Sequence, residues 1–251
     1  MKTGGSWIIL GATSAVARAF ARTRAAEGVH LLISARDQAE LDIMAADLTV
    51  RGAAGVVTLA GDAGDLALQT ALARRVLELP GPVSLFIATG LMPDHEAMLR
   101  DPALLANLMT TNATALMQMT NRLLPLFEDQ QAGAIVMLGS VAGDRGRKKN
   151  FIYGASKAAL AAYAQGLAAR LSAFHVPVLL VKPGVLDTAM TWGLKNPPLP
   201  LGQPEGLVKA VDRRLAKGAK GGGTLYFPWF WLGIMLIIRH LPTRIFNKLN
   251  F

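Results

Sequence analysis

Short runs of apolar residues alternate with longer amphipathic segments along most of the chain. Runs of this length, bounded by glycine, proline or polar residues, are typical of buried strands. They occupy residues 6–10, 29–34, 56–60, 83–88, 134–139, 177–181 and 225–227. The segments between them show the apolar spacing expected of helices. We place these helices up to about residue 27, up to 51, up to 79, from 101 to 124, and around 153–157.

Strands that alternate with helices of this length predict an α/β fold of the Rossmann type, a doubly wound, mostly parallel sheet of seven strands with helices on both faces. In such a sheet ligands bind at the carboxyl ends of the strands. We expect one catalytic domain over residues 1–227, followed by an apolar and basic tail over 228–251. A chain of 251 residues that is 52% hydrophobic can bury the core that one such domain requires.

The composition excludes several kinds of chemistry. The chain has no cysteine, so disulfides, thiolate catalysis and cysteine-bound zinc are ruled out. Its four histidines are scattered without metal-ligand spacing, and we expect no metal site. The first five residues lead directly into the first apolar run, without a long hydrophobic segment or a small-residue cleavage site. We therefore expect a cytoplasmic protein.

The first strand leads into a turn of small residues and then into a helix. This arrangement directs backbone N–H groups and a helix N-terminus at a pyrophosphate. A dinucleotide fingerprint has three glycines, but only Gly11 is present here, and alanines at positions 15 and 17 replace the other two. Each alanine adds one methyl group, so the approach of a phosphate is tighter. We expect Gly11, Thr13, Ser14 and Val16 to contact a bound nucleotide.

The ends of the next three strands carry further candidates for this site. Arg36 follows the second strand, at the position where an acidic residue would bind the ribose of NAD. An arginine there can pair with the 2′-phosphate of NADP, which favours NADP(H) over NAD(H), although it could be an ordinary surface residue. Asp62 with Ala63, and Gly90, end the third and fourth strands. We expect them at the nucleotide, with Asp62 on the adenine, but Asp62 could equally be a turn aspartate.

A serine, a tyrosine and a lysine form the most informative pattern. On a helix Tyr153 and Lys157 project from one face, so the ammonium can lower the pKa of the phenol from about 10 toward neutrality. Ser140 ends the fifth apolar run and points into a crevice. Asn112 lies among apolar neighbours on a helix, where it needs a local hydrogen bond or a water relay to the site. Residues 143–151 carry four cations before Tyr153, which suits an anionic substrate, the cofactor phosphates or a solvated loop.

The residues that follow the sixth strand are further candidates for the same site. The turn at Pro183 and Gly184 would let the backbone approach a flat ring, with Val185 next to it. Thr188 could hold a carboxamide or a phosphate. Residues 190–203 are rich in proline and glycine, and we interpret them as a loop that could close over a substrate.

With these residues the chain resembles the short-chain dehydrogenases/reductases over roughly residues 6–227. The resemblance implies that Tyr153 is the general acid/base for a carbonyl/alcohol pair and that Ser140 positions and polarises the oxygen. It also implies that Lys157 lowers the pKa of Tyr153 and binds the nicotinamide ribose, while Asn112 holds a water between Lys157 and solvent. The hydride would come from the nicotinamide, and the protein would supply orientation and electrostatics.

Within this family, three features resemble the branch that contains decaprenylphosphoryl-ribose 2-keto reductase. They are the turn at residues 11–14, the basic loop at 145–147 and the aromatic tail. This narrower resemblance implies a polyprenyl-phosphate-linked sugar as substrate. The chain also departs from the family pattern, because residues 87–90 read Ile-Ala-Thr-Gly where the family has Asn-Asn-Ala-Gly.

The tail combines positive charge with apolar and aromatic residues. Residues 209–251 hold eight basic residues against one acid, giving +7 of the total charge of +9. The fifteen residues 224–238 are uncharged, which is too short for a bilayer span, and Pro228 interrupts them. We interpret this segment as a strand followed by an interfacial helix with Trp229 and its aromatic neighbours, in peripheral contact with the inner face of the membrane. The alternative is a helix buried in a homodimer or homotetramer interface.

Together these observations predict an NADP(H)-dependent oxidoreductase that interconverts a ketone and a secondary alcohol, on a hydrophobic or anionic substrate. An alternative within the same class is a soluble reductase of a hydrophobic or fatty carbonyl. An alternative of another class is a nucleotide-binding or regulatory protein without turnover, which the incomplete glycine turn would suit. The apolar surroundings of the basic residues argue against nucleic acid as a partner.

Overall fold

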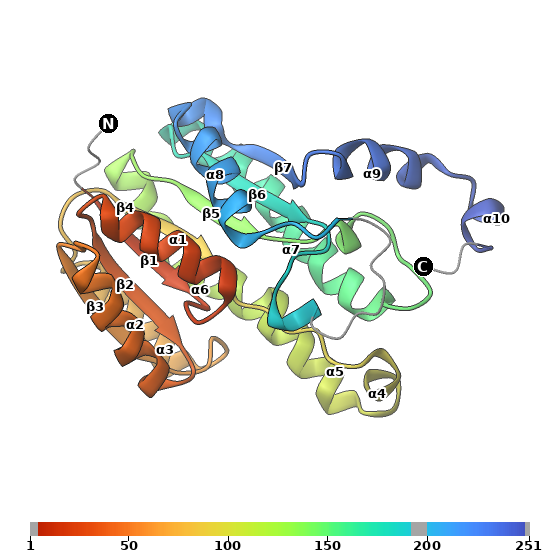
Figure 1. Cartoon of the computed structure of the whole chain (residues 1–251), viewed down its shortest axis with the longest axis horizontal. Helices are drawn as coiled ribbons and strands as arrows, with labels where there is room; N and C mark the ends of the chain where they lie inside the picture. Colours follow the sequence, from red (N-terminus) through yellow and green to blue (C-terminus); the bar gives the residue numbers. More distant parts are fainter. Residues whose placement is uncertain (1–4, 192–199, 249–251) are drawn as a thin grey trace.

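The computed structural model describes residues 5–191 and 200–248. Its centre is a sheet of seven strands in the order β3-β2-β1-β4-β5-β6-β7, and every neighbouring pair is parallel (Figure 1). The strands are β1 (Ser6–Leu10), β2 (His30–Ala35), β3 (Gly55–Ala60), β4 (Val83–Ile87), β5 (Ile135–Leu138), β6 (Val178–Pro183) and β7 (Gly223–Phe227). The predicted Rossmann-type sheet is therefore confirmed.

Helices cover both faces of the sheet. The helices are α1 (Ala15–Ala26), α2 (Gln38–Val50), α3 (Leu66–Val76), α4 (His95–Arg100), α5 (Pro102–Met109), α6 (Ala115–Gln130), α7 (Phe151–Leu171), α8 (Pro204–Leu215), α9 (Trp231–His240) and α10 (Thr243–Phe246). Helices α1, α2 and α8 pack on one face, and α3, α6 and α7 pack on the other. Because both faces are covered, almost every residue of the five inner strands is buried, whereas the edge strands β3 and β7 are only partly buried. This burial explains why the inner strands read as continuous apolar runs.

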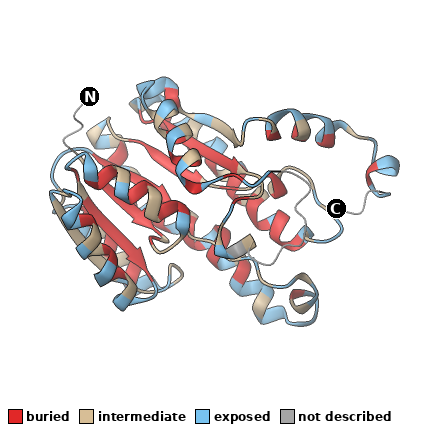
Figure 2. Ribbon diagram, in the orientation of Figure 1, coloured by how far each residue is buried: buried red, intermediate tan, exposed pale blue. Residues whose placement is uncertain are grey.

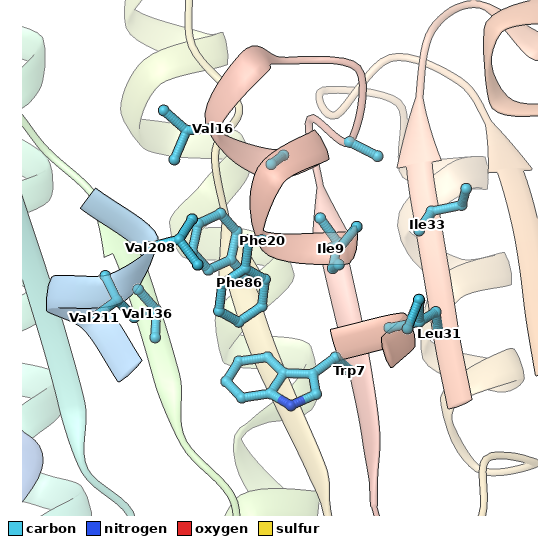
Figure 3. Packing of buried hydrophobic residues seen from close by; sticks show 14 of the residues in the cluster. Trp7, Ile9, Val16, Phe20, Leu31, Ile33, Phe86, Val136, Val208 and Val211 are labelled. Carbon is cyan, nitrogen blue, oxygen red and sulfur yellow. The ribbon is translucent and has the colours of Figure 1, made fainter. Parts of the chain in front are cut away.

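The face under α1 and α8 is packed around three aromatic rings (Figure 3). The ring of Phe20 stacks on that of Phe86 with 4.0 Å between centroids, and Trp7 meets Phe20 edge-on at 4.8 Å. Phe20 comes from α1, whereas Phe86 and Trp7 come from β4 and β1. The contact fixes α1 over the middle of the sheet, and so places the turn before α1 at the carboxyl ends of the strands.

Three helical regions differ from the sequence prediction, and the first is α4, which was not predicted. The helix expected over 101–124 begins with α5, passes through a π-helical turn at Thr110–Thr114, and continues as α6 to Gln130. The sequence analysis also did not predict α8, which begins directly after the proline-rich segment. Its apolar residues pack against the sheet, and its remaining residues are mostly charged.

The chain ends in two short helices beyond β7. Figure 1 shows α9 and α10 projecting from the body of the molecule at the end of β7. One side of α9 is buried and the other is exposed (Figure 2). Across the described ranges, no helix combines the length and the hydropathy that crossing a bilayer would require.

Candidate active site

A cleft of about 200 Å³ lies at the carboxyl ends of the first four strands. Predicted nucleotide-binding residues that line it are Gly11, Thr13, Ser14, Arg36, Asp62, Ala63 and Gly90. The sequence analysis missed other lining residues, among them Leu68, Leu91, Thr111 and Met119. Leu91 and Thr111 adjoin residues that were predicted, whereas Leu68 and Met119 come from α3 and α6 and reach the cleft only through the fold.

The turn between β1 and α1 is shaped by local packing. Gly11 adopts a φ of 71°, and a Cβ there would lie 2.6 Å from the backbone nitrogen of Thr89, so only glycine fits. Ser14 caps α1, and its side chain accepts a hydrogen bond from the N–H of Ala17 at 3.2 Å. The side chain of Val16 is packed in the core, so any contact of this residue with a nucleotide runs through its backbone.

The rim of the cleft at the ends of β2 and β3 carries one arginine and one aspartate. Arg36 is exposed and lines the cleft directly after β2. The next residue, Asp37, caps α2 by accepting a hydrogen bond from the N–H of Glu40 at 3.1 Å. The acid at this position is thus engaged in the helix, and the cation remains at the cleft. Asp62 lines the cleft and also closes a turn, accepting from the N–H of Gly64 at 2.8 Å.

Asn112 joins three parts of the site. It lies in the π-helical turn, fully buried. Its amide nitrogen donates to the carbonyl oxygen of Leu91 at 2.9 Å and to Oγ of Ser156 at 3.1 Å, and its oxygen accepts from the N–H of Leu91 at 2.8 Å. These bonds hold the segment after β4 against α7. They provide the local hydrogen bonding that the sequence analysis required for a buried asparagine.

Lys157 is buried next to Asn112. Lys157 is a buried residue of α7, and its Nζ donates a hydrogen bond to the carbonyl oxygen of Leu138 at 3.1 Å. A Cβ at Gly90 would lie 3.2 Å from Nζ of Lys157 and 3.4 Å from the amide oxygen of Asn112, so both polar groups border the backbone of Gly90. Burial disfavours the charged ammonium and lowers the pKa of Lys157 to about 8.

Tyr153 lies close to both Ser140 and Lys157. Burial raises the pKa of Tyr153, while a hydrogen bond with Ser140 and the positive charge of Arg147 oppose that rise. Nζ of Lys157 is 5.9 Å from the centroid of the Tyr153 ring. The structure therefore brings the three predicted catalytic side chains together. It adds Arg147, one of the four cations of the basic loop, as the cation that acts on the phenol.

A buried ion pair anchors the loop between Ser140 and Tyr153. The Asp144 side chain is 1% exposed, pairs with Lys182 of β6, and accepts a hydrogen bond from the hydroxyl of Tyr226 on β7 at 2.7 Å. Burial, together with the hydrogen bond to Asp144, raises the pKa of Tyr226 to about 12. The sequence analysis missed this group, because neither strand partner is near Asp144 along the chain.

The turn after β6 packs against the C-terminal segment. The N–H of Gly184 donates to the carbonyl oxygen of Phe227 at 2.8 Å, and a Cβ at Gly184 would lie 1.9 Å from Nε1 of Trp231. The indole of Trp231 thus lies directly on this glycine, and Val185 joins the same cluster. The backbone N–H of Thr188 donates to Oγ1 of Thr191 at 3.2 Å.

The remaining predictions for this region concern Pro183, the closing loop and metals. Pro183 is the last residue of β6 and comes directly before the turn that carries Gly184. Of the loop expected over 190–203, residues 192–199 lie outside the described residues. Within the parts of the chain that the structure describes, no three histidine or acidic side chains lie close enough to hold a metal ion.

A family model described as short chain dehydrogenase matches residues 6–198. An uncharacterized oxidoreductase of Streptomyces coelicolor is 32% identical over 97% of this chain and 95% of the relative, and one of Mycobacterium tuberculosis is 30% identical over 96% of both. A short-chain dehydrogenase from Sphingobium yanoikuyae, solved in complex with NADPH, superposes with a TM-score of 0.79 at 26% identity, covering 95% of this chain and 97% of its own. Actinorhodin polyketide ketoreductase with NADPH shares the fold, with a TM-score of 0.81 at 21% identity over 92% of this chain and 98% of its own.

Proposed function

The chain belongs to the short-chain dehydrogenase family and is an oxidoreductase, and from this premise we propose that it is an NADP(H)-dependent reductase that interconverts a ketone and a secondary alcohol. The observation that carries the proposal is the grouping of Ser140, Tyr153 and Lys157, with Lys157 bordering the backbone of Gly90, which lines the cleft at the strand ends. A protein that only bound a nucleotide would not need a buried phenol hydrogen-bonded to a serine.

The side chains divide the proton chemistry among them. A bound NADPH would supply the hydride that reduces the carbonyl carbon. Tyr153 donates its hydroxyl proton to the carbonyl oxygen, and Ser140, which shares a hydrogen bond with the phenol, orients that oxygen. The positive charge of Arg147 favours the phenolate that remains until a proton returns, and Nζ of Lys157 lies 5.9 Å from the centroid of the same ring. Asn112 holds the segment after β4 against α7, next to Lys157, through its hydrogen bonds to Leu91 and Ser156.

The rim of the cleft supports NADP(H) over NAD(H). Arg36 places a permanent positive charge at the end of β2, where the 2′-phosphate of NADP would lie. Asp37 is the nearest acid in sequence, and its carboxylate is occupied as the cap of α2. The relative from Sphingobium yanoikuyae was solved with NADPH, which agrees with this choice.

For the substrate we favour a hydrophobic carbonyl compound that carries an anionic group, with a polyprenyl-phosphate-linked sugar as the specific form. Arg147 supports the anionic group, because it acts electrostatically on Tyr153 from within the basic loop. The apolar cluster of Val141, Trp231 and Met235 supports the hydrophobic part, since it adjoins both Ser140 and the turn at Gly184. We place the reaction in the cytoplasm and expect a homodimer or homotetramer.

The test combines cofactor binding with a substitution of the phenol. Purified protein is titrated with NADPH and separately with NADH by fluorescence, and oxidation of NADPH is followed with a panel of ketones and aldehydes. We expect tighter binding of NADPH, and turnover that Tyr153→Phe abolishes while cofactor binding is kept. Tyr163→Phe is the matched control, because Tyr163 is on the same helix and its hydroxyl bonds Asn121 instead. Binding without turnover on any carbonyl would favour the non-catalytic alternative, and turnover that survives in Tyr153→Phe would refute the assigned role.

A further inference from the structure

The C-terminal segment, residues 228–248, presents two different faces. One face of α9 is formed by Trp231, Met235 and Ile238, which are buried against the catalytic domain. Within the described residues, the segment also carries large apolar side chains that are exposed. We call this set the outer face, and it consists of Leu232, Leu236 and Ile237 on the other side of α9, Trp229 just before α9, and Ile245 in α10.

The outer face is far more exposed than apolar side chains of its size usually are. Trp229 is 82% exposed, Ile237 is 66% exposed, and the other three members are each at least half exposed. Leu232 and Leu236 are one helical turn apart, and Ile237 lies on the same outward half of α9. Several large apolar groups on one outward half of a short helix indicate a binding surface rather than scattered surface residues.

Positive charge borders the outer face. Arg239 lies in the last turn of α9, Arg244 lies in α10 and Lys248 follows it, and all three are exposed. The chain has no acidic residue after Asp212. Exposed apolar and aromatic side chains with only basic neighbours match the chemistry of an anionic lipid interface, where the apolar groups enter the acyl region and the cations meet the headgroups.

We propose that the outer face docks on an anionic lipid bilayer and brings the active site to a carbonyl substrate carried by that bilayer. The second half of this proposal rests on the reductase function proposed above, whereas the docking does not. A second copy of the chain is a poorer occupant. A twofold contact through the same patch would bring the basic cluster of one copy toward that of the other, with no acid in the segment to offset them.

The docked segment is joined directly to the catalytic residues. Arg145, in the loop between Ser140 and Tyr153, donates hydrogen bonds to the carbonyl oxygens of Ile238 and Leu241, the latter at 2.6 Å. Its guanidinium lies 4.0 Å from the centroid of the Phe246 ring. On the other side, Trp231 lies on Gly184, in the turn that follows β6. A bilayer that meets the outer face would therefore lie one helix thickness from the catalytic loop.

Vesicle flotation tests the docking. Purified full-length protein is mixed with vesicles of phosphatidylcholine alone or of phosphatidylcholine with phosphatidylglycerol, and the floated fraction is measured over a range of lipid concentrations. The outer-face variant combines Trp229→Ser with Ile237→Ser. The control variant combines Val50→Ser with Leu77→Ser, which are also strongly exposed but lie at the end of α2 and directly after α3. Because all four positions are exposed, the fold should tolerate these changes, and circular dichroism with an NADPH titration checks this.

We expect the wild type to float with the phosphatidylglycerol vesicles and to float poorly with phosphatidylcholine alone. The outer-face variant should lose about tenfold or more in lipid affinity, because each large apolar side chain contributes strongly to burial, and the control variant should bind like wild type. Replacing Arg244 and Lys248 by glutamine should remove the preference for the anionic lipid. Raising the salt from about 0.1 M to about 1 M should weaken binding in the same way, since it shortens the screening length from about 10 Å to about 3 Å.

Three outcomes would overturn the docking. They are a wild type that does not float, an outer-face variant that floats as well as wild type, and an oligomer by light scattering that the outer-face substitutions convert to monomers. The last would show that a second copy covers the face. NADPH binding and turnover of water-soluble carbonyls are measured on the same samples, so failure of the reductase assignment would be seen separately from failure of the lipid contact.

Discussion

Lys157→Met should stabilise the protein near neutral pH, by an amount that disappears as the pH rises. Burial lowers the pKa of Lys157 from 10.5 to about 8, a shift of 2.5 units, which corresponds to about 3 kcal/mol at about 1.4 kcal/mol per unit. The folded protein therefore carries a destabilising charge below pH 8. Methionine removes that charge but also removes the hydrogen bond to Leu138, which is worth about 1 kcal/mol. At about pH 7 the variant should be more stable by about 2 kcal/mol.

The pH dependence separates this effect from others. Between pH 8 and pH 10.5 the unfolded chain keeps a proton on Lys157 that the folded chain has lost, so the stability of the wild type rises with pH across that window. The variant lacks this contribution. The difference between the two free energies of unfolding should shift by about 3 kcal/mol between about pH 7 and the upper end of the window, while effects of the other titrating groups cancel.

Urea unfolding followed by circular dichroism measures this difference at each pH. Lys148→Met is the matched control, because Lys148 is an exposed lysine of the basic loop. A difference for Lys157→Met that is the same at both ends of the window would refute the reasoning. It would mean that the ammonium is solvated or paired in the folded protein.

Three further substitutions test other parts of the site. Asp144→Asn should lower the free energy of unfolding in urea by about 3–5 kcal/mol, because it leaves the buried charge of Lys182 unpaired. Adding Lys182→Met should recover most of this loss, and an unchanged urea midpoint for Asp144→Asn would contradict the buried ion pair. Gly184→Ala should lower the free energy of unfolding by about 1–3 kcal/mol, because the new Cβ would lie 1.9 Å from Nε1 of Trp231. The double variant Gly184→Ala with Trp231→Ala should be no less stable than Trp231→Ala alone, since the clash is then absent. Arg36→Ala should weaken NADPH binding about tenfold or more and leave NADH binding unchanged. Equal losses of affinity for the two cofactors would argue against a contact between Arg36 and the 2′-phosphate.

The fold could be predicted because its main signal is local. Each strand is a run of apolar residues, and each of the first helices follows at a regular interval, so the order of elements could be read along the chain. Helix α8 escaped prediction because its signal is a narrow apolar stripe in a charged segment, following a proline-rich loop. The π-helical turn escaped because Asn112 is held by Leu91, and that contact depends on the finished fold.

Part of the grouping of the site residues was predictable from the sequence, but their connections to the rest of the fold were not. Tyr153 and Lys157 are four residues apart, so their proximity follows from helix geometry alone. The pairing of Asp144 with Lys182 and Tyr226 could not be seen, because a charge in a loop looks solvated until strands from elsewhere bury it. The basic loop was open to three interpretations, and the structure shows that its members differ, since Arg147 acts on the phenol and Arg145 holds the C-terminal segment.

The neighbouring residues Asp144 and Arg145 have a consequence for anyone who wishes to build chimeras from this protein. One holds the catalytic loop to the sheet, and the other holds the last two helices to the loop. The C-terminal segment, residues 228–248, is therefore tied to the catalytic domain at Arg145 and at Gly184. A tail exchanged with that of a relative would need an arginine at 145 to receive its carbonyl groups and a glycine at 184 to admit its indole. A graft that ignores these two host positions should yield a folded sheet with a misplaced loop in front of Tyr153.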